Sequence, residues 1–290
     1  MVTLSKYNSS KYNLGIYNIE GGLLPNTVSL ELDGKGQYLS RTESTTALGA
    51  YNLGIYSDGI YNSPNNLGIG NTWTMGFWVR PIANKEHQTI FSTGDNSNKD
   101  RIDILSTPLP VETQVHSKRP SELRVIIKDF EGTTIKHYGW PDWFQTEVWT
   151  HTFLQWNGFD LNAFRNAFTT TTGVSFVNAS GIMGDEEGRR IYYGSAVAGQ
   201  FATFSGILGH FGMWSEILDP IELGTVVSGG FGIDLTTASA GYDSQANLQH
   251  YWKPGEDPTN IGKDYTTSGT ALNLTKERNI TDENIVSEAP

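Results

Sequence analysis

Cysteine is absent from this 290-residue chain, so disulfide bonds, zinc–thiolate sites and thiol chemistry are excluded. The absence fits synthesis in a reducing compartment. The first six residues lack the basic and apolar regions of a secretory signal peptide. No run approaches the roughly 18 apolar residues that a membrane helix needs. We therefore expect a protein that is made in the cytoplasm and does not insert into a membrane.

Basic residues are scarce in the chain. Lys and Arg number 20 against 31 Asp and Glu, which gives a formal net charge of −11. A surface that follows the phosphates of nucleic acid needs clustered Lys and Arg side chains. The sequence contains no such cluster, so nucleic acid is not expected as a partner.

Small turn-forming residues and aromatic residues are plentiful. The chain has 32 Gly and 11 Pro, and 12% of its residues are aromatic. This balance is typical of many short strands joined by tight turns. The length suffices for one large β-sandwich or for two small domains.

Alternation of apolar and polar residues predicts several strands. Val28, Leu30 and Leu32 alternate with polar neighbours before a Gly-containing turn. The other predicted strands cover residues 38–40, 73–81, 123–127 and 148–156. The spacing of these runs predicts an antiparallel two-sheet sandwich.

One helix has a clear start signal. Asp219 can cap it, Pro220 suits the first helical position, and Glu222 lies in the first turn, where the helix dipole favours a negative charge. Gly229 and Gly230 predict its end. The sequence therefore predicts an all-β protein with one short helix.

Residues 1–26 form a polar arm rich in Tyr, Asn and Gly. The hexapeptide YNLGIY at residues 12–17 recurs unchanged at residues 51–56, and irregular spacing excludes a solenoid. The two copies are either similar edge strands or loops, or segments that make equivalent contacts with neighbouring chains. The second interpretation makes residues 1–26 an assembly arm, with contact residues Tyr7, Tyr12, Leu14, Ile16 and Tyr17.

Five segments together resemble LamG-like domains, which have the concanavalin-type fold. The segments are VSLELDG at 28–34, WTMGFWVRP at 73–81, EVWTHTFLQWNG at 147–158, GILGHFGMWSEILDPIE at 206–222 and LQHYWKPGE at 248–256. The resemblance implies a two-sheet antiparallel jelly-roll sandwich over residues 27–290, which ends in an acidic segment.

The order of these segments resembles that of one particular group of LamG-like domains. The 248–256 segment comes first in many LamG-like domains, but here it follows the others, and the chain ends in DENIVSEAP. Both features resemble LamG-like modules of bacteriophage structural proteins, such as capsid decoration, head-fibre and tail-fibre proteins. The resemblance implies a location on the virion surface after synthesis in the host cytoplasm. It also implies a homo-oligomer, often a trimer, and contacts with other virion proteins.

Catalytic carboxylates are not evident. Glycoside hydrolases with this fold carry an E-x-D-x-E pattern on one strand face, which brings two carboxyl groups together. Here Glu31 and Asp33 lack a third member, and residues 185–187 lie in a Gly-flanked loop. The six His residues show no spacing typical of a triad or a zinc site. We therefore expect no enzymatic activity.

Two segments are candidates for ligand binding. Asp95, Asn96, Asn98 and Asp100 offer oxygen ligands that suit calcium. The segment lacks the glycine and the terminal Glu of an EF-hand, and a solvated turn rich in Asp and Asn is the simpler explanation. Sugar rings could stack on exposed aromatic side chains, or those side chains could fill the core. The aromatic candidates are Trp140, Trp143, Tyr192 and Tyr193.

Three functional hypotheses follow. The first is a non-enzymatic virion structural protein that assembles through its arm, and this is the main expectation. The alternative is a carbohydrate-binding module or adhesin that recognises glycans on the host surface, with possible support from calcium. A glycoside hydrolase is the third, and it requires a carboxylate pair assembled from distant strands.

Overall fold

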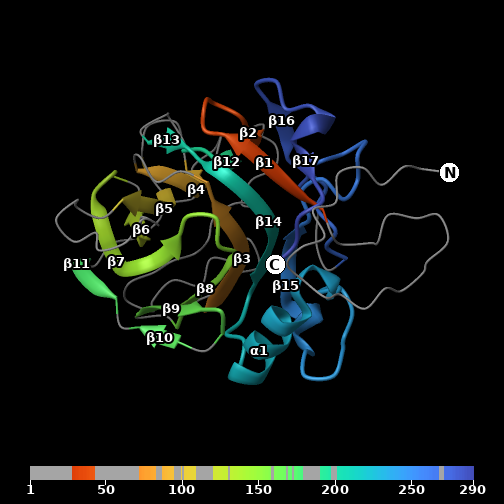
Figure 1. The fold of residues 1–290 in the computed structure, drawn as a ribbon. Coiled ribbons are helices and arrows are strands. Elements are labelled where there is room, and N and C mark those ends of the chain that lie inside the picture. The colour runs from red at the N-terminus through yellow and green to blue at the C-terminus, as the bar shows by residue number, and fades with distance from the viewer. Residues whose placement is uncertain are drawn as a thin grey trace, which may run out of the picture.

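A computed structural model describes residues 28–42, 72–82, 87–94, 99, 101–108, 120–129, 131–157, 160–167, 169–171, 173–178, 190–196, 201–267 and 271–290. Their strands form two sheets that face each other across one core (Figure 1). One short α-helix lies on the outside of the sandwich. The predicted jelly-roll sandwich is confirmed.

The first sheet, sheet A, contains eight strands. Its order is β10 (Thr169–Thr171), β9 (Leu161–Arg165), β8 (Thr150–Trp156), β3 (Trp73–Pro81), β14 (Ser205–Trp214), β1 (Ser29–Asp33) and β17 (Ile285–Val286), and β15 (Leu248–Trp252) also pairs with β14. Every pairing in this sheet is antiparallel.

The second sheet, sheet B, contains nine strands. Its order is β11 (Val174–Asn178), β7 (Thr134–Gln145), β6 (Pro120–Lys128), β5 (Arg101–Pro108), β4 (Gln88–Gly94), β12 (Arg190–Tyr193), β2 (Tyr38–Thr42) and β16 (Thr275–Glu277). The short strand β13 (Ala202–Thr203) pairs with β4 in parallel, and the other pairings are antiparallel.

The strand alternation read from the sequence explains the core. Leu30 and Leu32 of β1 are buried, whereas Asp33 is exposed. In β3 the predicted polar face is buried too, since Thr74 and Trp78 are as enclosed as the apolar positions. The outer face of sheet A is covered by the helix, and this explains the difference.

The helix α1 (Pro220–Gly229) begins as predicted. The Asp219 side chain accepts hydrogen bonds from the backbone N–H groups of Ile221 and Glu222, and the Glu222 side chain accepts from the Asp219 N–H. This reciprocal capping box satisfies backbone donors that a helix start leaves without partners. Leu223 and Val226 pack on the outer face of sheet A with Phe153, Trp214 and Tyr251 of the strands.

The acidic C-terminal segment docks on the sandwich. The 3-10 helix η5 (Asp282–Asn284) precedes β17, which pairs with β1. Ser29 Oγ donates to the Glu288 carbonyl at 2.8 Å, and Arg80 forms an ion pair with the Glu288 carboxylate. The end of the chain is therefore part of the fold.

Several predicted features lie outside the described residues. These are the arm 1–26, both YNLGIY copies and the acidic loop 185–187. Among the described residues, no helix is long and apolar enough to cross a membrane.

Candidate functional site

None of the four aromatic candidates for sugar binding forms the exposed platform that was predicted: Trp140, Trp143 and Tyr193 lie in the core, and Tyr192 lies on the outer face of sheet B but is only 7% exposed. Trp140 and Trp143 are 0% and 2% exposed, and Tyr192 and Tyr193 are also buried. Residues 141 and 142 belong to β7 and not to a surface loop, so both indoles turn into the core. The Trp143 Nε1–H donates to Thr152 Oγ1 at 2.8 Å. The sequence left open whether these side chains stack on sugars or fill the core, and for Trp140 and Trp143 the structure shows that they fill the core.

The predicted calcium ligands cannot be placed. Asp95, Asn96, Asn98 and Asp100 all lie outside the described residues. Among the residues that the structure does describe, no group of three or more His, Asp or Glu side chains is arranged to hold a metal ion. Calcium binding stays a prediction.

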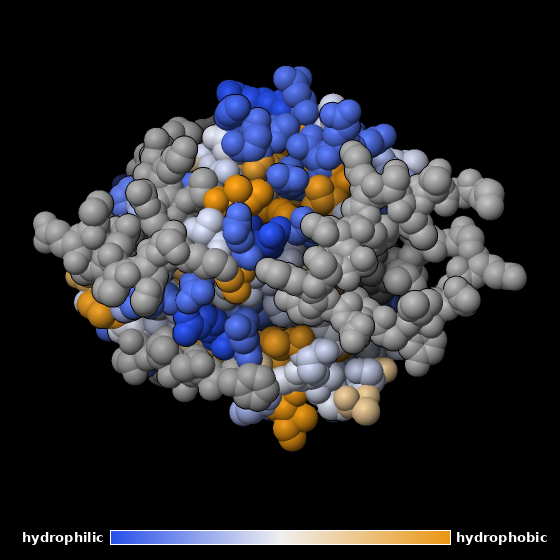
Figure 2. Space-filling view, viewed as in Figure 1, coloured by the Kyte–Doolittle hydropathy of each residue, from blue (hydrophilic) through white to orange (hydrophobic). Residues whose placement is uncertain are grey.

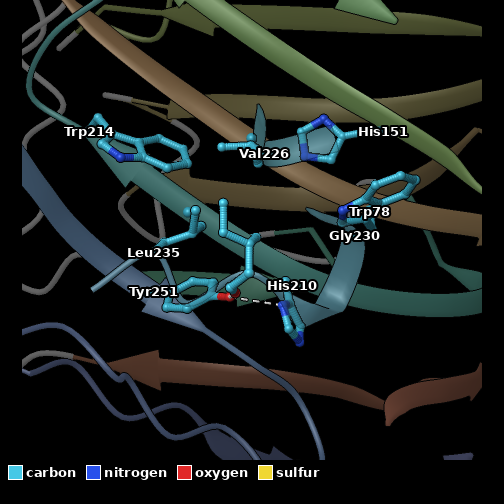
Figure 3. Close-up of a pocket in the computed structure, with 11 residues that line it drawn as sticks. Trp78, His151, His210, Trp214, Val226, Gly230, Leu235 and Tyr251 are labelled. Atoms are coloured by element: carbon cyan, nitrogen blue, oxygen red, sulfur yellow. Dashed lines mark hydrogen bonds between the residues drawn. The ribbon is translucent and has the colours of Figure 1, made fainter. Parts of the chain in front are cut away.

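A small pocket lies between α1 and the outer face of sheet A (Figure 3). Its volume is about 10 Å³, which is room for about one water molecule. His151 and His210 line it, and His210 Nδ1 lies 2.9 Å from the Tyr251 hydroxyl. Burial lowers the pKa of His151 to about 3, so the imidazole is neutral at neutral pH. The pocket is too small for a sugar or a cofactor, and we assign it to packing.

The outer face of sheet B carries polar and aromatic side chains. On β6, Arg124 and Ile126 alternate with the core residues Val125 and Ile127. Ile126 opposes His137 of β7 directly, and opposed residues in an antiparallel pair share a face of the sheet. His137 therefore lies on the outer face with Arg124.

An exposed aromatic ring lies at the β11 edge of this face. Phe176 is 51% exposed, and Figure 2 shows apolar surface at the left margin, where β11 lies in Figure 1. The Arg124 guanidinium carbon is 5.4 Å from the centre of the Phe176 ring, and the His137 ring centre is 4.8 Å from it. Arg124 Nε donates to Glu122 Oε2 at 2.6 Å. We call Glu122, Arg124, His137 and Phe176 the Phe176 cluster.

A β-bulge orients the ring. Ser175 pairs with Tyr138 and Val177 with His137, so Phe176 is an extra residue between two consecutive pairs. Bulges re-aim side chains and occur often beside functional sites. Gly139 lies beneath the ring, since a Cβ atom there would approach Phe176 to 2.8 Å. The bulge and Gly139 together allow the ring to lie over β7.

The charges of the Phe176 cluster balance within it. Arg124 and Glu122 form an ion pair whose side chains are 28% and 8% exposed. Burial, followed by the positive charge of Arg124, lowers the pKa of His137, which keeps the imidazole neutral at neutral pH. Its Nε2 atom is buried and has no hydrogen-bond partner among the described residues. The cluster thus combines an open ring face with hydrogen-bonding groups and no net charge.

The Phe176 cluster was not predicted from the sequence. Residues 158–172 have the composition of a surface loop, and the strand that follows them is only five residues long. The alternation of Val174, Phe176 and two polar residues is a weak strand signal. Only the pairing of β11 with β7 brings Phe176 to Arg124, because these residues are far apart in the sequence.

Comparisons with known proteins support the fold. No protein-family model matches the chain, and no curated protein sequence matches it. A Bacteroides ovatus structure, provisionally described as a carbohydrate-binding protein, has a TM-score of 0.50 and 13% identity, with 88% of this chain and 59% of that chain covered. At this identity the match indicates the fold alone.

Two other solved structures are more distant. A heptameric pentraxin from Limulus polyphemus has a TM-score of 0.44 and 16% identity, with 71% of this chain and 84% of that chain covered. A Ruminococcus gnavus sialidase module, CBM40, bound to α2,3-sialyllactose, has a TM-score of 0.45 and 13% identity, with 69% and 96% covered.

Proposed function

We propose that this protein is a non-enzymatic carbohydrate-binding module that contacts its glycan through the Phe176 cluster. The observation that carries the proposal is a half-exposed aromatic ring flanked by an Arg–Glu pair and a neutral His on one sheet face. The Bacteroides ovatus protein of similar fold is provisionally described as carbohydrate-binding, and this also supports the proposal.

The chemistry of the cluster suits a sugar. The C–H face of a pyranose ring is apolar and can cover the exposed face of Phe176. This contact is favourable because it removes apolar surface from water. Sugar hydroxyl groups can accept hydrogen bonds from Arg124 and donate to Glu122. Because the ion pair already holds these two side chains together, little side-chain entropy is lost when a ligand binds.

Binding without hydrolysis is part of the proposal. Glycoside hydrolysis uses two carboxyl groups on either side of the scissile bond. Among the described residues, the Phe176 cluster contains one carboxylate, Glu122, and this carboxylate is engaged by Arg124. We therefore expect retention of a polysaccharide without its cleavage.

The substitution Phe176→Ala tests the proposal. Full burial of a Phe side chain is worth about 1.5–3 kcal/mol, so covering one ring face contributes about 1.4 kcal/mol, or about tenfold in affinity. Affinity electrophoresis through gels that contain laminarin, xylan, mannan, dextran or hyaluronate measures retention. We expect at least one polysaccharide to retard the full chain, and the variant to lose most of that retardation.

A matched control is available on the opposite sheet. Ile221 on α1 is 68% exposed, and Figure 2 shows apolar surface at the bottom margin, over this helix. The substitution Ile221→Ala removes a comparable exposed apolar group and should leave retardation unchanged. Equal losses in both variants, or no retardation of the full chain by any of the five gels, would contradict the proposal.

The virion role stays a separate prediction. It depends on the arm 1–26, which lies outside the described residues. Assembly on a particle and glycan binding are compatible, because the Phe176 cluster is at an edge of sheet B and belongs to the folded sandwich.

A further inference from the structure

A second aromatic and polar cluster lies on sheet B. The rings of Tyr38 and Tyr192 have centres 5.3 Å apart, and the Arg190 Nη1–H donates to the Tyr192 hydroxyl at 3.2 Å. Beside them, Ser40 Oγ donates to Glu277 Oε1 at 2.7 Å. We call Tyr38, Ser40, Arg190, Tyr192 and Glu277 the Tyr38 cluster.

Both clusters occupy the same face of sheet B. Directly opposed residues share a face, as do residues two apart on one strand. The opposed pairs that connect the clusters are His137 with Ile126, Ile126 with Asp103, Asp103 with Ser92, Ser92 with Tyr192, and Tyr192 with Ser40. Tyr38 is two residues from Ser40, so its side chain also points outward.

The clusters lie at opposite ends of this face. The strand order from β11 to β12 crosses five strand spacings, or about 24 Å at about 4.8 Å each. Between them, the outward side chains of Ser92, Arg101 and Asp103 are buried, and the Phe201 ring centre lies 5.8 Å from the Arg101 guanidinium carbon. The face therefore presents two separate clusters with a covered strip between them.

The composition of the Tyr38 cluster repeats that of the Phe176 cluster. Each combines an aromatic ring, an Arg and a Glu. Tyr38 and Arg190 are partly exposed. Each cluster also has one buried nitrogen without a hydrogen-bond partner among the described residues, Arg190 Nε here and His137 Nε2 in the other. A buried donor left without a partner is costly, so a rotation of the Arg190 side chain that brings its Nε–H to a ligand oxygen would be favourable.

We infer that the Tyr38 cluster is a second glycan subsite, and that one polysaccharide chain binds across sheet B at both clusters. This inference rests on the proposed function. A chain long enough to span the face binds the second cluster at a high effective concentration, which raises the affinity above that of either cluster alone. A trisaccharide is too short to reach both clusters and fills them independently.

Isothermal titration calorimetry tests the inference by stoichiometry. The ligands are a trisaccharide and a dodecasaccharide cut from a polysaccharide that retards the full chain. We expect two trisaccharides per protein chain but one dodecasaccharide, bound at least tenfold more tightly. The substitution Tyr38→Ala should reduce the trisaccharide stoichiometry to one and the dodecasaccharide affinity to that of a trisaccharide.

Two further variants distinguish loss of the second subsite from a folding defect. Tyr38→Phe keeps the ring and should keep both stoichiometries, whereas Arg190→Gln removes the guanidinium and should lose the second site. A full chain that binds one trisaccharide, with binding lost in Phe176→Ala and unchanged in Tyr38→Ala and Arg190→Gln, overturns the second subsite and leaves the proposed function intact. Absence of any saccharide binding overturns both.

Discussion

Single residues on the outer face of sheet A hold α1 in place. The Gly76 and Gly212 positions oppose each other across β3 and β14, and a Cβ atom on Gly76 would lie 2.6 Å from the Phe153 ring. Near them, the ring centres of His210 and Phe231 are 4.3 Å apart in a stacked arrangement. The aromatic layer under the helix depends on these close approaches.

The buried imidazoles in this layer make stability depend on pH. Burial lowers the pKa of His151 to about 3. The pKa of His210 is also lowered, by burial and then by the positive charge of Lys253. In the unfolded chain both imidazoles have a pKa near 6.5, so below that pH only the unfolded state takes up these protons. For His151 this contribution to stability is complete above about pH 6.5 and falls as the pH drops towards 3, by about 1.4 kcal/mol per pH unit. The contribution of His210 changes in the same direction.

The substitution His151→Phe isolates one of these contributions. It keeps an aromatic ring beside Trp78 and Phe153 and removes the titrating group. Urea denaturation at pH 7 and pH 4.5 should give a smaller drop in unfolding free energy for the variant, by about 2–3 kcal/mol. Equal drops for the two proteins would show that His151 is not held neutral.

At the scale of elements, the sequence correctly predicted five strands, which correspond to β1, β2, β3, β6 and β8, and the helix. Period-two alternation identified β1, β3, β6 and β8, because each has one face in the core. The start of α1 was predicted by its cap, since Asp219 and Glu222 act within one turn. The edge strand β11 was missed because it is short and exposed.

The α1 cap gives a direct test at this scale. Replacement of Asp219 by Ala removes the acceptor for two backbone N–H groups and should lower the free energy of unfolding by about 1 kcal/mol. Chemical denaturation measures the change. Ser228→Ala, at an exposed position near the other end of α1, serves as the control and should change stability by less than about 0.5 kcal/mol. A cap variant as stable as the control would contradict this role.

At the scale of the whole molecule, one buried carboxylate organises the crossing from sheet A to sheet B. Asp264 accepts hydrogen bonds from the backbone N–H groups of Tyr251 in β15, Thr266 and Leu272, and lies 2.8 Å from His250 Nδ1. The chain then enters β16 at Thr275. Burial acts to raise the pKa of Asp264, but the hydrogen bond and charge of His250 and the backbone donors outweigh it, and the pKa is lowered.

Removal of this carboxylate should destabilise the entire sandwich. Asp264→Ala leaves three backbone donors and one imidazole without their acceptor, and breaking such a buried network costs about 3–5 kcal/mol. Thermal unfolding followed by circular dichroism should show one transition at a clearly lower temperature. Asp257→Ala, in an exposed turn of the same segment that bonds Thr259 and Lys263, should have a much smaller effect. Similar shifts in both variants would argue against a special role for Asp264.

The sequence alone determined the all-β class, the positions of five strands and the helix start, because alternation and capping act between residues a few positions apart. Only the tertiary structure decided which aromatic side chains are buried and which meet solvent. Trp140 and Trp143 are core residues because β7 continues through their segment. Phe176 is exposed beside Arg124 because a bulge and strand pairing bring them together. These outcomes depend on long-range pairing and on what covers each sheet face, which local sequence patterns do not encode.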